Sequence, residues 1–245
     1  PSGNLLLGGT ITISGSPTFN HNNGTIVIDG STATLSCNNV VFNLVTIAFA
    51  TGTKTINSNC TFPLGNNPTV TSTNGAAITL NGSLSATGIL TYANGTLTMN
   101  SGAALSGINA LSIRALTVAG ANLDMSGYNS FSQTSSSLAL TLSSGSVALP
   151  INSDIDGSLI ISGGTFTAPS GNMTLAGALT ISGSPTFNHN NGVISWRGAG
   201  GTLSCGNIVF NRIDMSIALG NRIVNSNCNL PLGNNPVIEG TTTLN

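Results

Sequence analysis

Short segments in which apolar residues alternate with Ser, Thr or Asn recur along the whole chain. Examples lie at 10–13, 26–28, 78–80, 97–99, 111–113, 138–142 and 159–161. Alternation with period two predicts half-buried β-strands. Between these segments stand Ser-Gly, Asn-Gly and Asn-Asn pairs, which supply the positive φ angles of tight turns. No stretch has the period and caps of an amphipathic helix, so the pattern predicts an all-β protein.

A long repeat is superimposed on this short pattern. The stretch TISGSPTFNHNNG at 12–24 recurs unchanged at 180–192, and all further matches share the same offset of 168 without a gap. Of the 77 positions that can be aligned, 42 are identical. We therefore divide the chain into one complete repeat, 1–168, and the start of a second copy, 169–245, continuous with the first in one elongated domain. We expect further copies beyond one or both ends.

Four cysteines form two equally spaced pairs. Cys37 and Cys60 have a spacing of 23 in the sequence, and Cys205 and Cys228 have the same spacing. A coil of a parallel β-helix takes about 20–25 residues, and stacked strands lie about 4.8 Å apart, so residues one coil apart can form a disulfide. We therefore predict the disulfides Cys37–Cys60 and Cys205–Cys228, and with them an oxidising, extracellular compartment. Four buried free thiols are the alternative.

Evenly spaced short strands are compatible with a sandwich, a propeller or a solenoid. Three observations favour the solenoid. The residues that stay fixed between copies are turn residues, the charges that usually protect the edge strands of a sandwich are nearly absent, and the cysteine spacing fits one coil. We predict a right-handed parallel β-helix of about ten coils of roughly 23–24 residues, with seven coils in each long repeat.

Charge narrows the functions that this fold can serve. Only 4% of the residues are charged, and the net charge is -1. The five basic residues stand singly, which argues against nucleic acid and against anionic membrane surfaces as partners. The longest apolar runs, such as 40–42, are far shorter than a membrane-spanning helix, so we expect no membrane insertion. We also expect no cofactor, no metal and no catalytic residues.

The acidic residues give little support to an enzyme. Asp154 and Asp156 alone lie close in sequence, where alternate positions of a strand could bind one calcium ion weakly, although a solvated turn is the favoured interpretation. Asp29 is replaced by Arg197 in the second copy, so an acidic site is not preserved. A polysaccharide-degrading β-helix enzyme is therefore the least favoured function. The remaining acids are Asp124, Asp214 and Glu239.

Three further residue types carry weaker hypotheses. His21 and His189 occupy the same place in Phe-Asn-His-Asn-Asn-Gly, which predicts a role in a turn. Trp196 stands where the first copy has Ile28, which favours core filling over a platform for sugars. Glycosylation triplets are expected by chance in a chain rich in Asn-Gly turns. These triplets begin at Asn23, Asn81, Asn94 and Asn172.

Threonines offer one candidate binding surface. Thr-x-Thr pairs about one coil apart predict a flat threonine array that could bind ice or polysaccharide, but the second copy breaks the pattern. The pairs are Thr10/Thr12, Thr32/Thr34 and Thr53/Thr55, and their counterparts are Ala178/Thr180, Gly200/Thr202 and Asn221/Ile223.

The run GGTFTAPSGNMTLAGALTISGSPTFNHNNG at 163–192 leads to a Cys-x-Asn-x-Val-Phe-Asn stretch at 205–211. Together they resemble the repeat regions of very large bacterial cell-surface or extracellular β-helix proteins, which are adhesin-like or fibre-forming. The resemblance implies a secreted or surface-attached fibre, sheath or adhesin stalk. We therefore predict a structural protein that associates end to end with itself or continues into further repeats. A polysaccharide- or ice-binding β-helix, with a surface polysaccharide as partner, is the alternative.

Overall fold

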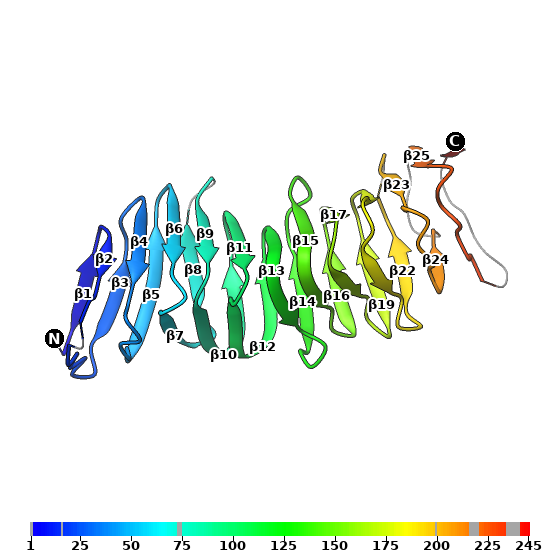
Figure 1. Ribbon diagram of the computed structural model, residues 1–245. Coiled ribbons are helices and arrows are strands. Elements are labelled where there is room, and N and C mark those ends of the chain that lie inside the picture. The colour runs from blue at the N-terminus through cyan, green and yellow to red at the C-terminus, as the bar shows by residue number, and fades with distance from the viewer. Residues whose placement is uncertain (1, 16, 73–74, 199, 216–220, 234–240) are drawn as a thin grey trace. The chain divides into compact units, whose positions relative to one another are not determined.

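The computed structural model describes residues 2–15, 17–72, 75–198, 200–215, 221–233 and 241–245. Every helix or strand among these residues is a β-strand. The chain divides into two compact units, Pro1–Arg114 and Ala115–Asn245. Both are parallel β-solenoids, and together they have about 11 turns (Figure 1). The predicted all-β parallel fold is therefore confirmed.

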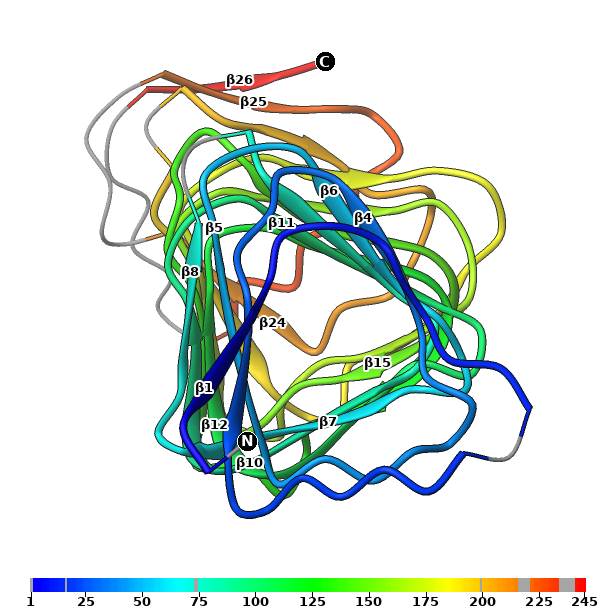
Figure 2. The same ribbon diagram turned by 90° about the vertical axis from the view of Figure 1, so that its left-hand side faces the viewer.

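Each coil of the first unit contributes strands to as many as three faces (Figure 2). The first face consists of β1 (Asn4–Leu7), β3 (Thr25–Ile28), β5 (Leu44–Phe49), β8 (Thr69–Ser72) and the C-terminal parts of β10 (Ser83–Tyr92) and β12 (Ala104–Ile113). The second consists of β2 (Ile11–Thr12), β4 (Ala33–Ser36), β6 (Thr53–Ile56), β9 (Ala77–Leu80) and β11 (Thr96–Asn100). On the third, β7 (Thr61–Asn66) pairs with the N-terminal part of β10, which pairs in turn with β12.

The second unit has the same three faces. The first consists of β14 (Ser130–Gln133), β16 (Asn152–Ile155), β19 (Asn172–Leu175), β22 (Val193–Trp196) and β24 (Arg212–Asp214). The second consists of the N-terminal parts of β13 (Leu116–Asp124) and β15 (Ala139–Ala148), then β17 (Ser158–Ile161), β20 (Leu179–Ile181), β23 (Thr202–Ser204), β25 (Asn221–Val224) and β26 (Thr241–Leu244). The third consists of the C-terminal parts of β13 and β15 with β18 (Thr165–Thr167) and β21 (Thr186–Asn188).

The boundary between the two sequence copies lies inside the second unit, between positions 168 and 169. The strands on its two sides pair in parallel on every face: β16 with β19, β17 with β20, and β18 with β21. The stack of strands therefore continues through the boundary without an interruption in pairing.

The strand register gives the length of each coil. Thr25 pairs with Leu44, at an offset of 19, whereas Ile11 pairs with Leu35, at an offset of 24. The offsets run from 19 to 24, and several coils on both large faces have the intermediate offset of 21, as between Asn4 and Thr25. With 21 as the mean, the repeat length of 168 corresponds to eight coils instead of the seven expected. The sequence-based figure was too low because the cysteine spacing of 23 comes from one of the longer coils.

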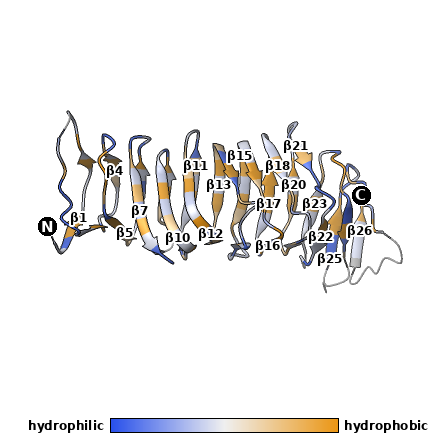
Figure 3. Ribbon diagram, turned by 90° about the horizontal axis from the view of Figure 1, so that it is seen from below, coloured by the Kyte–Doolittle hydropathy of each residue, from blue (hydrophilic) through white to orange (hydrophobic). Residues whose placement is uncertain are grey.

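The core is built from inward-facing apolar side chains. In β9, Ile78 and Leu80 are buried while the residues before them are partly exposed, and Leu159 and Ile161 repeat this pattern in β17. The alternation appears in Figure 3 as orange bands that interrupt the paler strands. Because every second side chain of a strand points inward, each coil adds one layer to the apolar core.

Phenylalanines at equivalent positions of successive coils stack into two short rows. Ring centres lie 5.5 Å apart from Phe19 to Phe42 and from Phe42 to Phe62. In the second unit the spacing is 5.6 Å from Phe166 to Phe187 and 5.5 Å from Phe187 to Phe210. Such rows follow from the short rise of a solenoid, which places like residues in direct contact.

Candidate functional site

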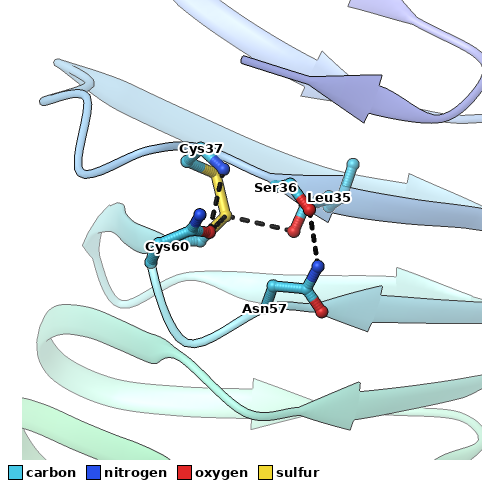
Figure 4. The surroundings of a disulfide bond; sticks show 6 residues. Leu35, Ser36, Cys37, Asn57 and Cys60 are labelled. Atoms are coloured by element: carbon cyan, nitrogen blue, oxygen red, sulfur yellow. Dashed lines mark hydrogen bonds between the residues drawn. A yellow bond between two sulfur atoms is a disulfide. The ribbon is translucent and has the colours of Figure 1, made fainter. Parts of the chain in front are cut away.

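One polar arrangement that the two copies share is a corner closed by a disulfide. Cys37 and Cys60 are joined with their Cα atoms 4.9 Å apart, and Cys205 and Cys228 are joined with the same separation. All four cysteines are paired, so both predicted disulfides are present and the free-thiol alternative is wrong. Each disulfide links one coil to the next, as Figure 4 shows for Cys37 and Cys60.

Asparagine side chains hold this corner in place. The side-chain amide of Asn57 donates a hydrogen bond to the Ser36 hydroxyl at 2.5 Å (Figure 4). The side-chain carbonyl of Asn59 accepts one from the backbone N–H of Cys37 at 3.0 Å. The equivalent residues of the second copy repeat both bonds at the same 2.5 and 3.0 Å. These bonds also join successive coils, so the corner is a cross-link between coils rather than a catalytic arrangement.

A second shared feature, a buried cation, was not predicted. Lys54 is 1% exposed, and Arg222, which stands at the same place in the second copy, is 0% exposed. The Lys54 ammonium donates to the Gly30 carbonyl and lies 5.2 Å from the centre of the Phe49 ring. Loss of hydration lowers the pKa of Lys54 below its usual value, and the charge of Asp29 opposes this shift only in part.

The second copy keeps the cation but changes its aromatic neighbour. The Arg222 guanidinium lies 5.3 Å from the centre of the Trp196 ring and donates to the Met215 carbonyl at 2.9 Å. Trp196 is fully buried, and its indole N–H donates to the Gly177 carbonyl at 2.9 Å. The prediction that Trp196 fills the core is therefore confirmed. Both cations lie over an aromatic ring, an arrangement that offsets part of the cost of burying the charge.

The sequence did contain a signal for the buried cations. In β6 the order Thr53-Lys54-Thr55-Ile56 places Lys54 on the same face as the buried Ile56, and Arg222 shares its face with Val224. Position 54/222 is also the only one that is basic in both copies. A basic residue at an inward position, kept basic across the repeat, predicts a buried cation.

The two neighbouring carboxylates, Asp154 and Asp156, are both exposed on the outside of the coil. Partial burial and the charge of Asp156 raise the pKa of Asp154, and Arg197 opposes the shift. Within the part of the chain that the structure describes, no group of three or more His, Cys, Asp and Glu side chains could bind a metal ion. Glu239 lies outside the described residues.

The histidines act in turns, as predicted. The ring nitrogen Nδ1 of His21 accepts a hydrogen bond from the backbone N–H of Asn23 at 3.1 Å. His189 makes the same bond to Asn191 at 3.0 Å. Asn23 and Asn191 have positive φ angles of 58° and 57°, which asparagine adopts more readily than most residues.

Three of the four glycosylation triplets begin at asparagines whose side chains bond to a neighbouring coil. Asn81 accepts a hydrogen bond from Asn100 at 2.8 Å, and Asn172 accepts one from Ser195 at 2.8 Å. Asn94 accepts one from Arg114 at 3.3 Å. The fourth, Asn23, lies in the exposed turn after His21. The three bonded amides thus hold successive coils together.

Outward-facing threonines form a row on the second face of the first unit. Ile11 pairs with Leu35, so Thr34 rather than Thr32 lies beside Thr10, and the Thr34 N–H donates to the Thr10 hydroxyl at 3.4 Å. The predicted array therefore exists with a different register. Its members are Thr10, Thr34, Thr55, Thr79 and Thr98.

In the second copy this row is interrupted. Thr202 pairs with Ile223, and the position beside Thr202 on the preceding coil is Ala178. The threonine row is thus not part of the arrangement that the two copies share.

These features define a class: a repetitive parallel β-solenoid whose neighbouring coils are cross-linked by disulfides. Comparison of the chain with protein-family models, with curated protein sequences and with solved structures finds no match in any of the three. None of the residues that the structure describes forms a helix that could cross a membrane. The class therefore rests on the geometry and on the internal repeat.

Proposed function

We propose that the protein is a structural extracellular protein whose coils stack continuously from one repeat copy to the next, as in a surface fibre, sheath or adhesin stalk. The observation that supports this most strongly is the parallel pairing of strands on all three faces across the boundary at 168/169. A solenoid that passes from one copy to the next without a break can be lengthened by adding copies.

The distribution of change between the copies supports the same proposal. The disulfide corner and its two asparagine bonds recur with the same geometry, whereas the exposed charges differ, as when Asp29 is replaced by Arg197. If the function is to form a continuous stack of coils, cross-links between coils should be preserved from copy to copy, whereas surface charges can change. The disulfides also indicate a non-reducing environment.

Electron microscopy of the intact protein, isolated under non-reducing conditions, tests this function. We expect unbranched fibres of constant width. An antibody against the chain should label the cell surface or the medium rather than the cell interior. Compact, dispersed particles together with an intracellular location would contradict the proposal.

A catalytic role is not part of this proposal. The carboxylates that lie closest in sequence, Asp154 and Asp156, are exposed and stand without a third acid among the described residues. Turnover of an acidic polysaccharide that disappears in both Asp154→Asn and Asp156→Asn would show that this view is wrong.

The threonine row favours a second candidate function, binding of a regular surface such as ice or a polysaccharide. Five threonines in register present hydroxyl groups at the spacing of the coils, about 4.8 Å. Thermal hysteresis and a glycan array should then respond to Thr55→Lys in the middle of the row. Thr46→Lys on the first face is the matched control. Equal results for the two variants would exclude this face as the binding surface.

A further inference from the structure

The first coil of the chain presents an apolar end that no other coil of the first unit covers. Its inward side chains are partly exposed and line a cavity of about 240 Å³ that continues down to Phe62. The counterparts of these residues in the second copy are buried, none more than 4% exposed. The partly exposed residues are Leu5, Leu7, Ile11 and Ile13, and their counterparts are Met173, Leu175, Leu179 and Ile181.

In the second copy this end is covered by the coil at 149–168. Asn152 pairs with Asn172 on the first face and Leu159 with Leu179 on the second. On the third face the Phe166 ring stacks on the Phe187 ring at 5.6 Å, with an interplanar angle of 15°. One coil thus closes the core, extends both larger faces and completes the row of phenylalanines.

Two glycines show that the first coil has the shape needed for the same cover. A Cβ at Gly177 would lie 2.3 Å from the Gly157 carbonyl oxygen, and one at Gly171 would lie 2.7 Å from the Ile151 side chain. Their counterparts Gly9 and Gly3 have nothing within 4 Å of such a Cβ. Glycine is thus kept at two positions where only a covering coil would require it.

We propose that the apolar end of the first coil is the binding surface for a coil of sequence 149–168 from a preceding copy of the repeat. The register of the second copy transfers directly: Asn152 beside Asn4, Leu159 beside Ile11, and Phe166 over Phe19. The proposal rests on the proposed structural function and specifies the joint that such a function needs.

In the proposed joint, the preceding copy belongs to the same polypeptide. In a separate molecule of this chain, the coil at 149–168 is already covered by β19, β20 and β21 of its own second copy. In the second copy the link between covering and covered coil is the peptide bond from Ala168 to Pro169, and Pro1 is the counterpart of Pro169. The same Ala-Pro link would join a preceding copy to this chain.

The test adds one coil to the full chain, by placing a copy of the segment 149–168 directly before Pro1. Four amides should then become protected from hydrogen exchange by about tenfold or more, because their counterparts donate to the covering coil. The four amides are those of Gly8, Gly9, Ser14 and Thr18. Their counterparts in the second copy are the amides of Ala176, Gly177, Ser182 and Thr186. These donate to the carbonyls of Ile155 at 2.8 Å, Gly157 at 3.0 Å, Ile161 at 2.9 Å and Gly164 at 2.9 Å, in that order.

Three controls make the result specific. An extension of the same length and composition with a scrambled sequence should give no protection. Phe166→Asp in the added coil should remove the protection of Thr18, whereas Thr167→Asp, at the partly exposed position beside it, should retain it. The proposed joint is wrong if the native extension leaves the exchange of the four amides unchanged. It is also wrong if the scrambled extension protects them equally.

The outcome is independent of the microscopy of the intact protein. Protection by the native extension combined with an absence of fibres would refute the structural function and leave the joint in place. Fibres without this protection would refute the joint alone, since the coils would then have to meet in another way.

Discussion

Lys54 lies in the core of the solenoid at a position where hydrophobic residues are the rule. Burying an ammonium ion costs several kcal/mol, and a hydrogen bond to Gly30 with the nearby Phe49 ring offsets this cost only in part. The lowered pKa of Lys54 is the sign of the remaining cost. The second copy keeps a buried cation at the equivalent position, as Arg222, and so carries the same kind of cost.

This cost predicts how stability depends on pH. The pKa of Lys54 is lowered in the folded protein, so between the folded and unfolded pKa values the unfolded chain binds more protons. The free energy of unfolding should therefore rise with pH through this interval, up to the usual lysine value near 10.5. Lys54→Met should remove this rise and stabilise the protein at pH 8 by about 1 kcal/mol.

Urea unfolding at several pH values between about 8 and 10 measures the effect. The difference between wild type and Lys54→Met is the quantity to compare, because the tyrosines titrate equally in both; burial raises the pKa of Tyr92 to about 12. Arg222→Met serves as a control with a buried cation that does not titrate. A pH slope that persists in Lys54→Met would show that another group causes it.

At the scale of the strand and turn, the disulfide corner joins two coils that also share backbone hydrogen bonds. Each disulfide spans a sequence separation of 23, and both lie at the end of a strand on the second face. A loop of this length limits the unfolded chain, so its closure stabilises the fold by about 3 kcal/mol. The asparagine hydrogen bonds at the same corner stabilise the folded state further.

Replacing Cys37 and Cys60 by alanine should therefore lower the free energy of unfolding by about 3 kcal/mol, as should the same change at Cys205 and Cys228. The two losses should add, because the pairs lie in different units. Urea unfolding measures both, with Ser58→Ala in the exposed turn as the control. A loss no larger than that of Ser58→Ala would mean that the hydrogen bonds alone hold the corner.

The strands and the cross-links could be predicted because their signals are local. Alternation identifies inward residues such as Ile78 and Leu80, and one spacing of 23 identifies both disulfides. The number of coils per repeat and the threonine register could not be predicted in the same way. They depend on the sum of the turn lengths, which place Leu35 at an offset of 24 from its partner but Leu44 at an offset of only 19.

The partners of the buried cations lie beyond such local signals. Lys54 contacts Phe49 of the preceding strand, whereas Arg222 contacts Trp196, which stands where the first copy has Ile28. The cation keeps its position while its aromatic neighbour changes. Alternation can assign a cation to the core, but only the folded coil shows which ring covers it.

At the scale of the whole molecule, the number of coils in one repeat copy determines the length that each copy adds to the solenoid. Each copy, with its repeat length of 168, corresponds to eight coils with a mean length of 21, the offset between Asn4 and Thr25. With a rise of about 4.8 Å per coil, each added copy should lengthen the solenoid by about 38 Å. A low charge suits this design, because like charges stacked at such a short spacing would repel one another.

Recombinant chains with two, four and six complete copies test the relation between repeat and length. Small-angle scattering or electron microscopy should give particles whose long dimension grows by about 38 Å per copy while the width stays constant, since each copy continues the coils of the one before it. If the copies folded as separate compact beads, the long dimension of the particles would instead grow more slowly with the number of copies and would vary from particle to particle. The low charge adds a second criterion: the length per copy should not change with salt concentration, because few charges are present to be screened.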